Sequence, residues 1–123
     1  MKHKIWFDQD YEILRQEVIG AYSSQEARDS GAEYKKSLEG KPYRQLIVDL
    51  SQAGKMQDRQ TRKITSESLE DADISAVAFV GATAATRMIA KVLMKLGSNK
   101  ISTDFFKTDS EAVNWLNNKR GTK

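Results

Sequence analysis

Apolar positions follow two different periods along this chain, and their alternation predicts an α/β fold. Residues 74–80 are almost wholly apolar and rich in β-branched types, which is typical of a strand buried on both faces of a parallel sheet. Aliphatic residues then recur at helical spacing, and Gly97 is placed to end the helix that they predict; they are Ile89, Val92, Leu93 and Leu96. The small-residue turn 81–87 lies between the two elements. We interpret this stretch as the β–α unit around which the rest of the chain is organised.

Two strands, 4–8 and 13–19, open the chain and are predicted to form a hairpin. The second strand alternates imperfectly between polar and apolar residues, which favours an edge or half-exposed strand over a central one. Ser23 and Glu26 have the spacing of a capping box and predict the start of the first helix. Gly31 lies inside this helix, where glycine is less favourable than alanine by about 1 kcal/mol, so we expect it to permit a close approach to the sheet.

The second half of the chain continues the alternation of strand and helix. Residues 46–50 form a near-continuous apolar run and predict a central strand, whereas residues 59–70 predict a helix with few large aliphatic residues. Residues 101–106 are rich in β-branched and aromatic types and predict the last strand. Thr108 and Glu111 have the spacing of a second capping box, which begins a final helix.

The predicted order of elements is β-β-α-β-α-β-α-β-α, a mostly parallel sheet covered by helices. No linker or repeat interrupts it, so residues 1–123 are expected to form a single domain. The last helix is expected to end near Asn118, and residues 119–123 to form a frayed tail. The most apolar elements should bury five residues: Val48, Val77, Phe79, Ile89 and Leu93.

Composition and charge narrow the class of protein. The 20 basic and 17 acidic residues are interspersed, whereas nucleic-acid binders usually gather basic residues on one face, so nucleic acid is not an expected partner. No apolar run approaches the ~20 residues that span a bilayer, and the N-terminus has no signal-peptide core. The absence of cysteine excludes disulfides and makes a cytoplasmic location the default. The single histidine, His3, is expected in a solvated tail, and no metal or cofactor is predicted.

Several short motifs, in this order and spacing, are similar to those of a known family. They are Gly20 before a capped helix, residues 43–51 (YRQLIVDLS), residues 76–81 (AVAFVG), residues 87–90 (RMIA), and Phe105 and Phe106 before residues 112–116 (AVNWL). Together they resemble the STAS-like, SpoIIAA-like family of small bacterial α/β domains. The resemblance implies neighbouring strands in chain order. It also implies a regulatory role, because members include antagonists of anti-sigma factors and transporter appendages, and a related branch has been likened to lipid-binding CRAL-TRIO domains.

The chain departs from the family pattern at one functional turn. In the sigma-regulating members, an Asp-Ser-Ser-Gly turn follows the strand that ends in Asp-Leu-Ser, and its serine is phosphorylated by a partner kinase. Asp58 and Arg59 stand at the corresponding positions here, so the sequence lacks the phosphoacceptor. Asp58 could serve as a permanent negative charge, but a carboxylate carries less charge and fewer acceptor oxygens than a phosphate. We favour the simpler hypothesis that Asp58 caps the helix beginning at Arg59.

A second candidate site lies beyond the strand 74–80, where the N-terminus of the next helix could hold an anion. The residues predicted to line this crevice are Arg62, Gly81, Thr83, Thr86 and Arg87. Two arginines from adjacent helices could clamp a carboxylate or phosphate. The competing interpretation is that these arginines lie on the surface and pair with Glu67 or Asp104.

An enzymatic role finds little support in the sequence. Asp49 ends a central strand and could be catalytic, but a hydrogen bond to the following turn is its more common role, and Ser51 has no identified partner base. We therefore predict a noncatalytic regulatory or protein-interaction domain, with a protein partner or a homodimer formed through the N-terminal hairpin. The alternative is a carrier or sensor that binds a small anionic or lipidic ligand in the crevice. A weaker alternative is a hydrolase using Asp49 or Ser51.

Overall fold

The computed structural model describes residues 3–56, 59–84, 87–88 and 101–121. Its main sheet has five strands in the order β1-β2-β4-β6-β7. Only β1 runs antiparallel to its neighbour, and the other pairs are parallel. The strands are β1 (Lys4–Asp8), β2 (Ile13–Glu17), β4 (Gln45–Asp49), β6 (Ala76–Val80) and β7 (Ser102–Phe106). The α/β class and the chain-order arrangement of the main sheet are therefore confirmed.

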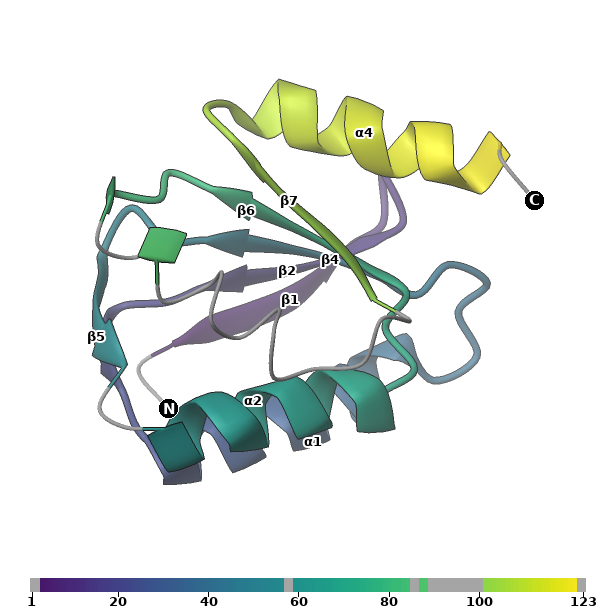
Figure 1. Cartoon of the computed structure of the whole chain (residues 1–123). Helices are drawn as coiled ribbons and strands as arrows, with labels where there is room; N and C mark the ends of the chain where they lie inside the picture. The colour runs from purple at the N-terminus through teal and green to yellow at the C-terminus, as the bar shows by residue number, and fades with distance from the viewer. Residues whose placement is uncertain (1–2, 57–58, 85–86, 89–100, 122–123) are drawn as a thin grey trace.

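The sheet separates two layers of helices (Figure 1). Helices α1 (Ser24–Leu38) and α2 (Arg59–Asp71) lie side by side on one face, and α4 (Asp109–Gly121) lies on the other. Two apolar clusters fill the space between the layers, one on each face of the sheet. Three of the predicted core residues, Val48, Val77 and Phe79, are buried as expected. The other two, Ile89 and Leu93, and the helix predicted around them, lie outside the described residues.

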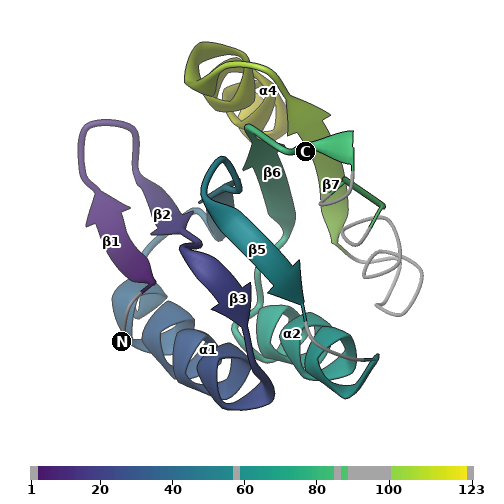
Figure 2. The same cartoon turned by 90° about the vertical axis from the view of Figure 1, so that its left-hand side faces the viewer.

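The structure adds a small second sheet that the sequence pattern did not predict. Strands β3 (Gly20–Tyr22) and β5 (Ala53–Met56) pair in parallel beyond the ends of β2 and β4. Figure 2 shows them in front of the main sheet. A four-residue strand without an apolar run has no periodic signal, so the pattern of apolar positions predicts no strand at β5. Its backbone pairing is decided by β3, which is distant in sequence.

Both helix starts predicted from capping boxes are present. The Ser23 hydroxyl accepts the N–H of Glu26, and the Glu26 carboxylate accepts the N–H of Ser23. At α4, the Thr108 hydroxyl accepts the N–H of Glu111 at 3.2 Å. These contacts satisfy backbone donors that would otherwise lack a partner in the first helical turn.

The structure corrects the expectation for Gly31. A Cβ built on Gly31 would lie 2.7 Å from the Cβ and Oγ of Ser68 in α2. The close approach that glycine permits is therefore between the two helices, and not between α1 and the sheet. The helices are held at this distance by Ser68, whose hydroxyl donates to the Ala27 carbonyl at 3.3 Å.

Strand β2 is not an edge strand, which corrects a second expectation. It lies between β1 and β4, and β1 forms the edge of the sheet. The polar residues that suggested an edge are satisfied inside the protein. Gln16 is buried under α1, where Tyr34 donates to its Oε1 and its Nε2 donates to Ser30 at 3.2 Å. Burial of the Tyr34 ring raises its pKa well above the ordinary value, which keeps the hydroxyl protonated as the donor.

Candidate functional site

Three connections meet beyond the carboxyl ends of the parallel strands. The N–H of Val18 donates to the carbonyl of Asp49 at 3.1 Å, and the N–H of Leu50 donates to that of Val80 at 2.8 Å. The segments that leave β2, β4 and β6 are therefore bonded to one another in the order of their strands. This edge is where an open α/β sheet usually places a ligand.

Gly81 lies directly against the turn that follows β4. Its backbone φ is 73°, a conformation that favours glycine, and an added Cβ would lie 3.0 Å from the Cβ of Ser51. The Asp49 Oδ1 atom accepts the N–H of Ser51 at 2.9 Å, so this carboxylate holds the turn closed. The geometry assigns Asp49 the turn-stabilising role that the sequence analysis considered the more common one.

The β3–β5 ribbon positions the start of α2. A Cβ added to Gly54 would lie 2.9 Å from the carbonyl carbon of Gly20, so the two strands approach too closely for a side chain there. Helix α2 begins at Arg59, and Arg59 and Gln60 are exposed. Asp58, which we expected to cap this helix, lies outside the described residues. The first turns of α1 and α2 are joined by a 2.9 Å hydrogen bond between the hydroxyls of Ser24 and Thr61.

The residues predicted for an anion crevice occupy different environments. Arg62 is partly buried, and its Nε atom is buried without a hydrogen-bond partner in the described part of the chain. Thr83 is exposed, and its carbonyl accepts the N–H of Arg87 at 2.9 Å. Arg87 is exposed, with its guanidinium 5.1 Å from the centre of the Phe105 ring. Thr86 lies outside the described residues.

No hydrogen bond or ion pair among the described residues joins Arg62 to Gly81 or Arg87. The cation–π contact on Phe105 gives Arg87 a partner that the sequence pattern does not indicate. Phe105 in turn stacks on Phe79, with ring centres 5.3 Å apart. Arg87 therefore covers the aromatic end of β6 and β7. The anion crevice stays a prediction.

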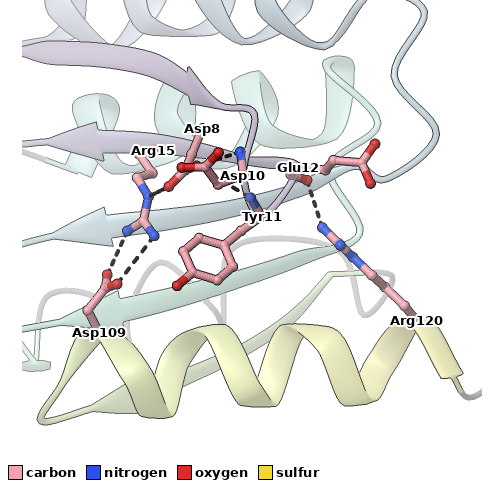
Figure 3. A network of polar contacts seen from close by, with 7 residues as sticks. All are labelled: Asp8, Asp10, Tyr11, Glu12, Arg15, Asp109 and Arg120. Carbon is pink, nitrogen blue, oxygen red and sulfur yellow. Dashed lines mark hydrogen bonds and ion pairs between the residues drawn. The ribbon is translucent and has the colours of Figure 1, made fainter.

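A network of charges that the sequence did not reveal ties the hairpin to α4 (Figure 3). Arg15 donates from Nε to Asp8 at 2.8 Å and from Nη1 to Asp109 at 2.6 Å. The pKa of Asp8 lies below its ordinary value. Partial burial raises this pKa, but the hydrogen bonds from Arg15 and from the backbone of Tyr11, together with the charge of Arg15, lower it by more. At the other end of α4, Arg120 donates to the carbonyl of Glu12 at 2.7 Å.

Arg120 and Lys119 lie in the last turn of α4 and not in a frayed tail. The Arg120 guanidinium also donates to the Gln45 side chain at 2.7 Å and stacks on the Tyr43 ring at 3.9 Å. These contacts extend α4 beyond the end at Asn118 that the sequence predicted.

His3 is buried, which corrects the expectation of a solvated tail residue. Its Nδ1 atom accepts the N–H of Ile19 at 2.9 Å, and its Nε2 atom lies 2.7 Å from the Glu26 carboxylate. Partial burial raises the pKa of Glu26, but the bonds from Ser23 and the contact with His3 outweigh burial and lower it. His3 thus stabilises the capping box of α1 through its contact with Glu26. No group of three or more histidine and carboxylate side chains suited to a metal gathers within the described ranges.

The described residues form a sheet in chain order with one antiparallel edge, two helices on one face and one on the other, and this arrangement is a SpoIIAA-like, STAS-like fold. The chain belongs to the family described as "Domain of unknown function (DUF7793)", whose sequence model matches residues 14–120. A comparison with curated protein sequences gave no match. None of the helices in the described part of the chain is long and apolar enough to cross a membrane.

Solved structures with this fold are similar to the chain over almost its whole length. An uncharacterised DUF3478 protein with a SpoIIAA-like fold from Shewanella loihica PV-4 gives a TM-score of 0.64 at 15% identity, covering 93% of this chain and 91% of that one. The anti-sigma factor antagonist SpoIIAA in its unphosphorylated form gives 0.62 at 10% identity, covering 97% and 98%. A single-residue variant of RsbS from Moorella thermoacetica gives 0.63 at 15% identity, covering 99% and 100%.

Proposed function

We propose that this protein is a noncatalytic regulatory domain that acts by binding another protein at the surface where β5 leads into α2. The observation that carries the proposal is the shared fold with an anti-sigma factor antagonist, over nearly the full length of both chains. At this surface the first residues of α2, Arg59 and Gln60, are exposed. They follow a ribbon that the close packing of Gly20 and Gly54 holds in place. A rigid support with exposed side chains suits recognition of a partner.

The partner interaction is proposed to be independent of serine phosphorylation at this turn. SpoIIAA exists in unphosphorylated and phosphorylated forms. In this chain Asp58 and Arg59 occupy the positions where the family resemblance places the serines. An aspartate followed by an arginine carries no net charge, whereas a phosphoserine adds about −1.5 to −2 charges. The surface is therefore constant in charge, and its binding depends on the concentration of the partner.

The local geometry supports a binding role over catalysis. The Asp49 carboxylate accepts the Ser51 N–H and holds the turn, so its oxygen is engaged in structure. The only histidine of the chain is buried beside Glu26. A serine hydrolase needs a base that is oriented toward the nucleophile, and no described side chain provides one for Ser51.

The proposal is tested by affinity purification from the native cell at ordinary expression level, with cross-linking and mass spectrometry to identify the partner and its contact site. We expect one protein to copurify with the unaltered chain and with the control Lys35→Glu, a charge reversal at an exposed position of α1. Arg59→Glu combined with Gln60→Glu should abolish its recovery. Equal recovery with both variants, or cross-links confined to other surfaces, would contradict the proposed interface.

A second candidate function is binding of a small anion in the crevice, and one observation favours it. The buried Nε of Arg62 has no hydrogen-bond partner among the described residues, and a buried N–H left without one is unfavourable by about 1–3 kcal/mol unless a bound group accepts it. Thermal unfolding with increasing inorganic phosphate tests this function. Phosphate should raise the melting temperature of the unaltered chain and of Arg28→Ala, an exposed arginine on α1, but not that of Arg87→Ala. Identical responses from all three proteins would remove this candidate.

A further inference from the structure

Strand β1 ends the main sheet with one side of its backbone unpaired. It bonds only to β2, and no other described strand pairs with it. Figure 2 shows β1 at the outer rim of the sheet, with α1 beneath it and no labelled element beyond it. The backbone groups on that rim are a template for another strand, because peptide N–H and carbonyl groups at an edge bond readily to an extended chain.

The side chains of β1 make this edge unusual for a protein surface. Trp6 is 44% exposed, although a tryptophan commonly covers core. Its cross-strand partner is Arg15, so Trp6 lies on the same face of the sheet as Arg15 and α4. Ile5 and Phe7 point to the opposite face, where they pack against the larger core. The edge thus presents a large aromatic ring on one face and a supported apolar pair on the other.

We propose that β1 pairs with β1 of a second copy of this chain, antiparallel and about a two-fold axis at Trp6. The five residues Lys4–Asp8 are self-complementary in this register. Lys4 lies opposite Asp8 of the second copy, Ile5 lies opposite Phe7, and Trp6 lies opposite its own counterpart. A two-fold interface requires such self-complementarity, since the same patch serves both sides. The Lys4–Asp8 and Ile5–Phe7 pairs then each occur twice, once on either side of the axis.

The charges at the two ends of β1 support this register. The group formed by Asp8, Arg15 and Asp109 has two carboxylates for one guanidinium, so one negative charge is left over. Lys4 is exposed and faces Glu17 of β2, but no ion pair joins Lys4 to a carboxylate of the described residues. A lysine on an edge strand usually discourages pairing. Here the symmetric register places Lys4 of each copy beside the excess negative charge of the other copy. Lys4 therefore favours pairing with a second copy of this chain over pairing with an unrelated strand.

The two-fold axis also places the same face of the sheet on the same side in both copies. An axis perpendicular to the sheet leaves equivalent faces on the same side, so Trp6 of both copies lies on the α4 side. Opposed aromatic residues on neighbouring strands are among the more stabilising cross-strand pairs. The result is one continuous ten-stranded sheet, twice the five strands of the single chain. Neither the first turn of α2 nor the crevice takes part, so the dimer is independent of the proposed partner surface.

The oligomeric state is tested first, by sedimentation equilibrium over a wide range of concentrations. The unaltered chain should approach twice its mass of 13.9 kDa. Lys4→Glu places like charges opposite each other at both ends of the interface. It should therefore raise the dissociation constant of the dimer by about tenfold or more. Its control is Lys63→Glu, a charge reversal at an exposed position of α2 that should leave the dimer unchanged. Circular dichroism checks that both variants fold.

The register is tested by disulfide trapping, which is possible because the chain has no cysteine. Only the residue on the axis meets its own counterpart, so Trp6→Cys should cross-link to a dimer under a mild oxidant. The matched control is Tyr11→Cys, which replaces an aromatic residue that is 48% exposed in the hairpin turn and should stay uncross-linked. Adding Lys4→Glu should slow the trapping of Trp6→Cys. A monomer at all concentrations, equal cross-linking of both cysteine variants, or no effect of Lys4→Glu would each overturn the proposal.

Discussion

Arg15 and Asp109 form a bidentate ion pair that joins strand β2 to the first turn of α4. Nη1 and Nη2 of the arginine lie 2.6 and 3.2 Å from the two carboxylate oxygens (Figure 3). The same guanidinium donates to Asp8 at 2.8 Å, so one cation joins β1, β2 and α4. Asp109 also lies at the N-terminal end of its helix, where a negative charge is favourable. The pair therefore links the hairpin at the sheet edge to the helix on the opposite end of the sequence.

Replacement of Arg15 should destabilise the protein through this junction. Arg15→Met keeps most of the side-chain length but leaves two carboxylates without their shared donor, and we expect a loss of about 1–3 kcal/mol in the free energy of unfolding. Urea denaturation measures the change. Arg28→Met, at an exposed position of α1, should change stability by less than about 0.5 kcal/mol. Similar losses in the two variants would show that the junction contributes little.

The acid sensitivity of the protein should depend on the same contact. The pKa of Asp8 is lower in the folded state than its ordinary value of 3.8, so the unfolded chain binds the proton more readily. The stability that Asp8 contributes is therefore complete above the ordinary pKa and is lost as pH falls through the lowered one. We expect the stability difference between the unaltered chain and Arg15→Met to shrink as pH falls from about 5 to about 2. Urea titrations at several pH values would refute this if the difference stayed constant.

Truncation of Phe79 should be severe because the ring is enclosed. It is 7% exposed and stacks on Phe105 from the neighbouring strand. Phe79→Ala leaves a cavity in the larger core, with an expected loss of about 3–5 kcal/mol, a large part of the stability of a domain of this size. Thermal denaturation should show a lower melting temperature or no folded state. Tyr11→Ala, at an exposed aromatic position, should lose less than about 1 kcal/mol.

Gly31 should be intolerant of alanine despite its place in a helix. Alanine is favoured over glycine in a helix by about 1 kcal/mol, but its Cβ would lie 2.7 Å from Ser68. We expect Gly31→Ala to destabilise the protein by about 1–3 kcal/mol, because the two helices must separate. The double variant Gly31→Ala with Ser68→Gly removes the obstructing atoms. Its loss in the free energy of unfolding should therefore be smaller than the sum of the losses in the two single variants. Additive losses in denaturant unfolding would place the strain elsewhere.

The elements that are encoded locally were predicted well. The apolar run at β6 and the capping box at Ser23 and Glu26 lie within a few residues of the atoms that they organise. A period or a cap needs no knowledge of the rest of the chain, so these starts and strand types follow from the sequence. The resemblance to the SpoIIAA-like family rests on the same ordered elements. In the candidate site, the turns at Ser51 and Gly81 lie side by side because β4 and β6 are adjacent parallel strands, as the order implied by the family resemblance requires.

The rest was decided by contacts between distant residues. A charged residue such as Arg15 within a strand suggests an edge strand. In the structure its guanidinium is paired instead with Asp109 of α4, which lies 94 positions away in the sequence. The position of His3 near the start of the sequence suggests a solvated residue. In the structure its ring is buried and contacts Ile19 and Glu26. Gly31 faces a helix and not the sheet because α1 and α2 pack on the same face. A charge, a histidine or a glycine is stabilised by whatever surrounds it in space, and no period along the chain carries that information. The sequence by itself therefore determined the elements and their order, whereas the tertiary structure determined which polar residues are buried, paired or left at the edge.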